Sequence, residues 1–261
     1  MFMYFDPRYI FFVMLPALVL TGLASWWVRS AYQKASRIPN MQHITGAQAA
    51  RRILDSAGLS YVNIEPTGPI QQIGPYQTGS PQPVPGRAYR PAAVTPQLND
   101  HYDPSSKVLR LSPSVYAGTS VAALGVAAHE AGHAVQDAEG YPWMRARTAI
   151  VPAANIGTNI GWILMFAGLI LHVVGIAWLG FGAFALGVVF ALLTLPVEIN
   201  ASTRAMKMLT ANGLVDRTEY GEARSVLTAA GFTYVAGLAV SLLNMLYWAM
   251  LITGMGGSRR D

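Results

Sequence analysis

Two histidines flank an acidic side chain in the stretch His129-Glu130-Ala131-Gly132-His133. On a helix, residues four apart lie one turn apart on the same face, so both imidazoles can reach one metal ion. Glu130 can then reach a water molecule bound to that ion. Zinc lowers the pKa of its water toward about 7, and the glutamate takes the proton and returns it to a leaving amine. The spacing therefore predicts a hydrolytic zinc site with two histidine ligands and Glu130 as general base.

A third ligand is needed, because a catalytic zinc takes three protein ligands and leaves one position for water. Glu198 is the favoured candidate, since a charge directly after an apolar stretch is unusual and needs a partner. Ser202, one helical turn further on, can brace a ligand through a hydrogen bond. Two alternatives stay open. Glu198 is an interfacial acid that ends the stretch, or Asp137 is the ligand, although on a straight helix Asp137 lies too far along the axis to join both imidazoles.

The composition predicts that part of the chain lies in lipid. Of 261 residues, 52% are hydrophobic and 12% are charged, against about 25% charged in an ordinary soluble domain. The chain has no cysteine, so nitrogen and oxygen ligands must hold any metal. The formal net charge is +5, yet the basic residues are scattered and form no nucleic-acid-binding motif. We expect a lipid bilayer as partner and no nucleic acid.

Four apolar stretches have the length of membrane-spanning helices, beginning with residues 9–28. A cleaved signal peptide is the rival interpretation of that stretch, but it is longer than a signal core and lacks a positively charged start. Residues 157–197 are predicted to form a tight transmembrane hairpin that turns around Leu179 and Gly180. The fourth span is 232–255. Buried core helices of a soluble protein are the alternative, which the absence of charge over such lengths disfavours.

The distribution of lysine and arginine predicts the topology. Four spans place the connecting regions, 29–156 and 198–231, on one side and the tails, 1–8 and 256–261, on the other. The connecting regions hold every lysine and arginine except Arg8, Arg259 and Arg260. Because basic residues near spans are retained in the cytoplasm, we expect both connecting regions to be cytoplasmic.

The large connecting region, 29–156, is predicted to form the metallopeptidase domain. A helix begins at the N-cap Thr45, with Gln48 at the capping-box position, and stops near Gly58. The proline-rich stretch 66–96 predicts a long irregular loop, and a mobile surface loop is favoured over a substrate lid.

Beyond that loop, a turn-forming cluster at 99–104 precedes a short strand at 107–111. A helical stretch opens at Ser112 and Pro113, and a helix of small residues, 120–138, carries the metal motif. The predicted fold class is mainly α, a multi-pass membrane protein with about four transmembrane helices and a zincin-like metallopeptidase domain containing a short β element.

These residues resemble those of a known family, the YugP-like neutral zinc metallopeptidases of bacterial membranes. The similarity covers most of the chain, including segments 99–104, 126–136 and 195–198, and the combination is more specific than the zinc motif alone. The resemblance implies a multi-pass protein of the bacterial cell membrane that holds one Zn²⁺ per chain. Its substrates would be proteins or peptides associated with the membrane.

That family is in turn similar to HtpX-like and CAAX-processing membrane peptidases, in which a glutamate within Glu-x-x-Ala-Asp is the third zinc ligand. This chain keeps the glutamate as Glu198 and has Ser202 in place of the aspartate. By analogy with zincins, the strand at 107–111 is expected to be an edge that binds substrate backbone. His101 and Asp103 are secondary candidates for substrate contacts, with stabilisation of a turn as an equal alternative.

The leading interpretation is a membrane-embedded endopeptidase. An intramembrane protease is disfavoured, because the helix around His129 carries or precedes several charged residues and is not itself a span. A catalytically inactive scaffold that binds metal and partner proteins is the alternative from another class, and the intact Glu130 weighs against it. Metal transport is a third possibility, disfavoured because the spans hold few polar residues, chiefly His172 and Asn244.

Overall fold

Long apolar helices dominate the chain. The computed structural model describes residues 6–67 and 99–257, so the predicted loop at 66–96 lies almost wholly outside the described residues. In the described part, four helical segments are long and apolar enough to cross a membrane: Pro7–Ser36, Pro142–Ile170, Val174–Ala211 and Arg217–Gly254. The mainly α class with four candidate spans and a small sheet is therefore confirmed.

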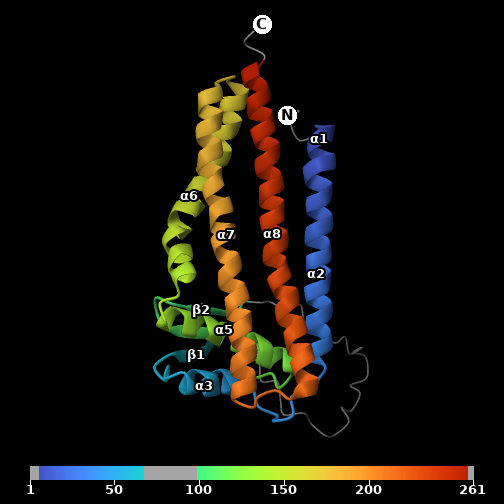
Figure 1. The fold of residues 1–261 in the computed structure, drawn as a ribbon, viewed down its shortest axis with the longest axis vertical. Helices are drawn as coiled ribbons and strands as arrows, with labels where there is room; N and C mark the ends of the chain where they lie inside the picture. The colour runs from blue at the N-terminus through green and yellow to red at the C-terminus, as the bar shows by residue number, and fades with distance from the viewer. Residues whose placement is uncertain (1–5, 68–98, 258–261) are drawn as a thin grey trace, which may run out of the picture. The chain divides into compact units, whose positions relative to one another are not determined.

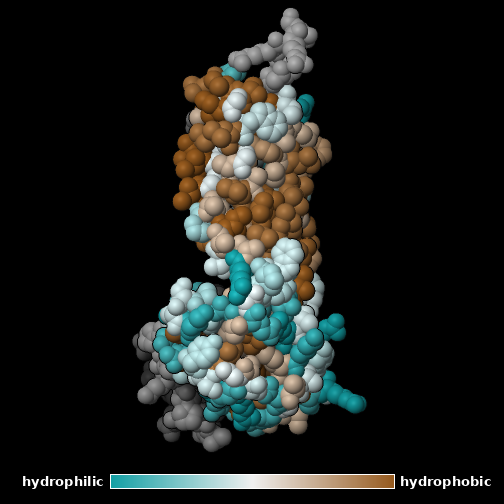
Figure 2. Space-filling model, turned by 60° about the vertical axis from the view of Figure 1, so that its left-hand side comes forward, coloured by the Kyte–Doolittle hydropathy of each residue, from teal (hydrophilic) through white to brown (hydrophobic). Residues whose placement is uncertain are grey.

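The chain divides into two compact units. We call one the membrane unit; it comprises Met1–Ala31, Gln136–Arg204 and Ser225–Asp261. The other, the sheet unit, comprises Tyr32–Val135 and Ala205–Arg224. Figure 2 shows hydrophobic side chains gathered over the long helices of the membrane unit, whereas hydrophilic side chains are frequent over the sheet unit. Large apolar side chains are exposed on these helices, as expected where lipid is the solvent.

In the membrane unit, α6 (Pro142–Ile170) and α7 (Val174–Ala211) form a hairpin (Figure 1). Its turn contains His172, which has a φ of 57°. The predicted turn at Leu179 and Gly180 is wrong, because both residues lie inside α7. Gly180 instead packs against Gly161, where a Cβ on either glycine would lie 2.8 Å from the carbonyl oxygen of the other. The glycine serves close helix packing rather than a turn.

Aromatic rings hold α8 (Arg217–Gly257) on the hairpin. The ring centroid of Trp248 lies 5.2 Å from that of Trp162 and 5.5 Å from that of Phe166, both in edge-on arrangements. The first span consists of α1 (Pro7–Tyr9), a π-helical turn η2 (Ile10–Met14) and α2 (Leu15–Ser36). It contacts α8 through Trp27, whose ring centroid is 5.3 Å from that of Phe232.

The helices extend further than the predicted spans. The predicted hairpin ends at residue 197, but α7 continues through Pro196 and on to Ala211 without a break. A proline inside a helix removes one backbone donor and favours a bend, and membrane helices tolerate it where neighbouring groups satisfy the freed carbonyl. Likewise α8 begins at Arg217, well before the predicted start of the fourth span, and α2 runs to Ser36.

In the sheet unit, the predicted capped helix is confirmed as α3 (Gly46–Ser56). The Thr45 hydroxyl accepts from the Gln48 backbone N–H at 3.1 Å, and the Gln48 side chain accepts from the Thr45 backbone N–H at 2.9 Å. The helix ends before Gly58, whose φ of +74° suits a residue without a Cβ.

Three short strands form the sheet: β1 (Asn63–Pro66), β2 (His101–Asp103) and β3 (Val108–Leu111). Their order is β1-β3-β2, with β3 parallel to β1 and antiparallel to β2. The strand predicted at 107–111 is therefore confirmed as β3, but the expectation that it is an edge is wrong. Its two sides are both paired, and β2 comes from a cluster predicted only as a turn.

Two helices follow the sheet, α4 (Pro113–Tyr116) and α5 (Val121–Ala138). Helix α5 matches the predicted helix and carries the histidine pair. Its small side chains at Ala127, Ala128 and Ala131 are fully buried, so the backbone of this helix is closely surrounded. Tight packing of this kind fixes the rotation of α5 and, with it, the directions in which its histidines point.

Candidate metal centre

Helix α5 presents both predicted histidine ligands on one face. The ring centroids of His129 and His133 are 4.8 Å apart, and the ring planes are inclined by 86°. The side chains lie one turn apart, as the four-residue spacing requires. His133 is 8% exposed and Glu130 9% exposed. The motif thus lies in a largely dry environment, where metal ligands and a general base are screened little by water.

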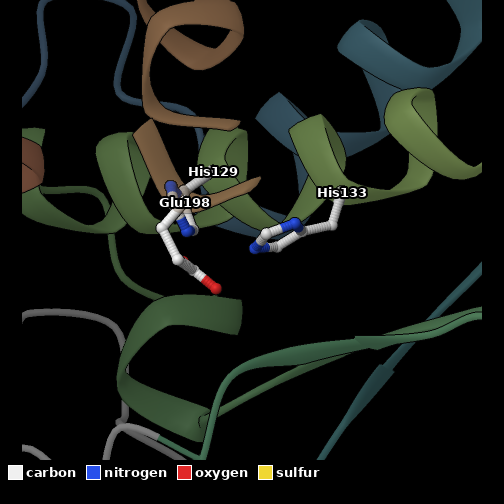
Figure 3. Close-up of side chains that lie close together, drawn as sticks. All are labelled: His129, His133 and Glu198. Carbon is white, nitrogen blue, oxygen red and sulfur yellow. The ribbon is translucent and has the colours of Figure 1, made fainter. Parts of the chain in front are cut away.

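Glu198 of α7 joins the two histidines. Each of the three residues offers one ligand atom, and these atoms all lie within 4.8 Å of one another. Figure 3 shows the Glu198 carboxylate turned toward the two imidazoles. Asp137, the alternative third ligand, does not belong to this group, which was identified among the described residues. The structure therefore brings together the three residues that the sequence favoured.

The chemistry of these three side chains suits zinc. Two imidazole nitrogens and one carboxylate oxygen form a donor set found in catalytic zinc sites, and such a set leaves a fourth position for water. Ligands about 2.1 Å from a tetrahedral ion lie roughly 3.4 Å apart, so small side-chain rotations suffice to close the site. The burial of the Glu198 carboxylate is also consistent with a metal site. Glu198 is only 2% exposed, and a buried negative charge needs a positive partner.

One such partner is Arg147 of α6, which the sequence reasoning did not single out. Its Nη1 lies 3.5 Å from Glu198 Oε1. The Arg147 side chain is 30% exposed, whereas that of Glu198 is 3% exposed. The guanidinium therefore supplies positive charge to the carboxylate while remaining in contact with solvent.

A half-buried acid, Asp100, lies immediately before β2. Its carboxylate accepts hydrogen bonds from the Ser112 backbone N–H at 2.6 Å and the Ser112 hydroxyl at 3.1 Å. Burial raises the pKa of Asp100 to about 6; the bonds from Ser112 oppose this rise, and the charge of Glu130 adds to it. Asp100 is therefore close enough to Glu130 for the two charges to influence each other.

The secondary candidates lie on β2 and α7. His101 is exposed, and its Nδ1 is 2.9 Å from the carbonyl oxygen of Asn99. Asp103 accepts from the Ser105 backbone N–H at 2.9 Å and pairs with Arg110 at 3.1 Å. Bonds of this kind hold the pKa of Asp103 well below its usual range and support the turn-stabilising alternative. Ser202 lies inside α7, one turn beyond Glu198.

The sequence contains features that could have pointed to Asp100 and Arg147, which the sequence analysis did not single out. Side chains alternate along a strand, so Asp100 falls on the same side as Tyr102, which is buried. Because residues 99–104 were predicted only as a turn, this alternation was not considered. Arg147 stands where an apolar helix begins, and an arginine there needs an acidic partner as much as Glu198 needs a basic one.

Comparison with known proteins finds similarity to a zinc metallopeptidase family. A family model described as "putative neutral zinc metallopeptidase" matches residues 10–72 and 92–253. The chain is also similar to the "Putative membrane protease YugP" of Bacillus subtilis (strain 168), with 36% identity over 240 residues that cover 92% of this chain and 95% of that protein. No solved structure matches the chain significantly. The family match includes the segments that carry His129, His133 and Glu198.

Proposed function

The chain belongs to the neutral zinc metallopeptidase family, and on that premise we propose that it is a membrane-embedded, zinc-dependent endopeptidase. The observation that carries the proposal is the convergence of two imidazoles and a buried carboxylate, with ligand atoms within 4.8 Å of one another, beside Glu130. Under this proposal, His129, His133 and Glu198 hold one Zn²⁺ per chain.

Glu130 is the general base of the proposed reaction. Bound zinc would act as a Lewis acid and lower the pKa of a coordinated water toward about 7. Glu130 takes one proton from the attacking water as the oxygen bonds to the carbonyl carbon of the peptide. The carbon–nitrogen bond then breaks, and Glu130 delivers that proton to the departing amine. Burial of Glu130 strengthens its electrostatic interactions and keeps it close to the reacting groups.

The proposed site acts at the cytoplasmic face of a bacterial membrane. The basic residues on the segments between the candidate spans support this orientation, since lysine and arginine near spans are retained in the cytoplasm. Proteins and peptides in or next to the membrane are the proposed substrates. The spans would keep the catalytic residues near such substrates and raise their effective concentration.

Cleavage of a casein or membrane-protein substrate by detergent-purified full-length chain tests the proposal. Wild type, Glu130→Gln and Glu65→Gln are compared after each is confirmed to hold one zinc. We expect Glu130→Gln to lose activity by roughly 100- to 10,000-fold, because general-base catalysis contributes that much. Glu65, a half-exposed acid on β1, is the matched control and should leave cleavage unchanged. Equal cleavage by wild type and Glu130→Gln would remove the assigned base, and zinc-loaded wild type that cuts nothing would favour the scaffold.

A further inference from the structure

A fully buried carboxamide joins the end of α5 to the part of α7 that carries Glu198. Gln136 is 0% exposed and lies three residues after His133 on α5. Its Nε2 donates to the carbonyl oxygen of Val197 at 2.9 Å and to Oδ1 of Asn200 at 2.9 Å. These two acceptors lie on either side of Glu198 in the sequence. The carboxamide is therefore bonded to the α7 backbone at the residue before Glu198 and to a side chain two residues after it.

The same contact continues outward through an ion pair. Asn200 Oδ1 also accepts from Arg204 Nε at 2.7 Å, and Arg204 Nη2 lies 2.6 Å from Glu139 Oε2. The side chain of Glu139 is 54% exposed, so this outer end is solvated and worth little by itself. At the inner end the bond from Gln136 to Val197 is buried and the bond to Asn200 is part-buried, so these hydrogen bonds are costlier to break than the outer ion pair.

The helix needs such a contact at this position. Pro196 has no backbone N–H, so the carbonyl one turn earlier in α7 lacks its usual helical donor. Helices bend most readily at prolines. Glu198 follows Pro196 by two residues, and a change of bend there would move its carboxylate. The bond to the Val197 carbonyl oxygen holds the backbone just beyond the proline, and the bond to the Asn200 side chain restrains the same turn of α7.

We propose that Gln136 and Asn200 are positioning residues that hold Glu198 in place for the metal. They touch neither metal nor substrate and act by fixing the direction and rotation of α7 beside the end of α5. The inference rests on the proposed zinc site. It also assigns to a different pair of residues the bracing that Ser202 was predicted to provide.

Zinc affinity of the detergent-purified full-length chain, measured by competition with a chromophoric chelator, tests this inference. Gln136→Met keeps the volume but removes both donated bonds, and Asn200→Ala removes the shared acceptor. We expect each to raise the zinc Kd about 10- to 100-fold, as loss of residues that orient metal ligands does. Asn200→Asp keeps an oxygen that can accept from Gln136 and Arg204. Unlike Asn200→Ala, it should therefore have the wild-type zinc Kd.

A matched control separates positioning from general stability. Asn40 is also fully buried, and its carboxamide donates to Ile44 and Thr119 in the sheet unit. Asn40→Ala should lower the thermal midpoint of the metal-free protein while leaving the zinc Kd unchanged.

Several results would overturn the inference. One is wild-type Kd in both Gln136→Met and Asn200→Ala; another is equal weakening by Asn40→Ala. If Gln136→Met is not recovered folded, the Asn200→Ala and Asn200→Asp pair decides alone, and weak binding by both variants counts against positioning. Failure of wild type to hold zinc would instead defeat the proposed function itself.

Discussion

Helix α7 has two halves that are held in different ways. From Val174 to Val188 it packs against α6 and α8 through close backbone contact at Gly180 and apolar side chains such as Phe184. Around Glu198 it is held by directional polar contacts, a carboxamide from Gln136 and a guanidinium from Arg147. One continuous helix therefore combines a packed apolar half with a polar half.

The two kinds of contact in α7 affect different properties of the protein: apolar packing affects its stability, and polar contacts affect the position of Glu198. Close packing between apolar helices tolerates small sliding movements, because dispersion contacts are many and individually weak. Hydrogen bonds to buried groups have narrow distance and angle limits, so they fix a position. We therefore expect changes in the apolar half to alter the free energy of unfolding and changes in the polar half to alter metal binding.

Replacement of Glu198 is expected to have the largest effect. Glu198→Ala removes one of the three proposed ligands, and we expect the zinc Kd to rise by at least about 100-fold. Metal content after dialysis, together with chelator competition, measures this, and Glu222→Gln is the control because its carboxylate pairs with Lys34. A full metal equivalent held at unchanged affinity by Glu198→Ala would exclude Glu198 and return attention to Asp137.

Gly161→Ala should disturb the packing of α6 against the apolar half of α7. A Cβ at Gly161 would lie 2.6 Å from the backbone nitrogen of Phe184, so the helices must separate. We expect destabilisation of up to about 3 kcal/mol in detergent, measured by thermal unfolding of the metal-free chain. Gly182→Ala is the matched control, because no atom within 4 Å would meet its Cβ. Zinc affinity of folded Gly161→Ala should equal that of wild type; a parallel loss would mean that the two halves are not separable.

Local rules predicted the parts of the fold that depend on neighbours in sequence. The capping box at Thr45 and Gln48, the extent of α5 and the strand β3 follow from short patterns. The histidine pair also follows from spacing on one helix. Glu198 could be chosen because an acid beside an apolar stretch has an electrostatic cost that demands a partner.

Tertiary contacts decided what the sequence left open. Gly180 has the composition of a turn, but its role depends on Gly161 of another helix. The predicted hairpin ends at residue 197, but α7 continues past Pro196, and Gln136 of α5 donates to the carbonyl oxygen of Val197 there. The central place of β3 depends on a partner strand whose pattern was hidden by turn-forming residues. Each error concerned a residue whose function is set by a distant segment.

In the sheet unit, Asp100 is a half-buried acid that accepts hydrogen bonds from Ser112. Its pKa of about 6 lies above the ordinary value of 3.8, so the folded state keeps the proton longer than the unfolded state. The free energy of unfolding should therefore fall as the pH rises from 3.8 to 6 and then stay level with respect to this group. Asp100→Asn removes that fall, and above pH 6 we expect it to be more stable than wild type by about 1–2 kcal/mol.

Thermal midpoints of metal-free proteins between pH 4 and 7.5 measure the effect of Asp100→Asn. Asp103→Asn is the control of opposite sign, because bonds from Ser106 and Arg110 hold the pKa of Asp103 below its usual range. Its stabilising effect is present at neutral pH and lost in acid, so Asp103→Asn should be less stable than wild type at neutral pH. A stability difference between Asp100→Asn and wild type that does not change with pH would contradict the assignment.

Arg147→Met should have the smallest effect on metal binding. The change in zinc affinity should be opposite in direction to that expected for Gln136→Met. The guanidinium compensates the Glu198 charge in the metal-free protein, but it opposes the charge of an incoming cation. Its removal should lower the thermal midpoint of the metal-free protein and raise zinc affinity by less than about tenfold, equivalent to less than about 1.4 kcal/mol. Arg145→Met, on an exposed turn of the same helix, is the control and should change neither quantity. Weaker zinc binding by Arg147→Met would mean that Arg147 orients the Glu198 carboxylate, as Gln136 is proposed to do. Arg147 would then both compensate the charge of that carboxylate and fix its position.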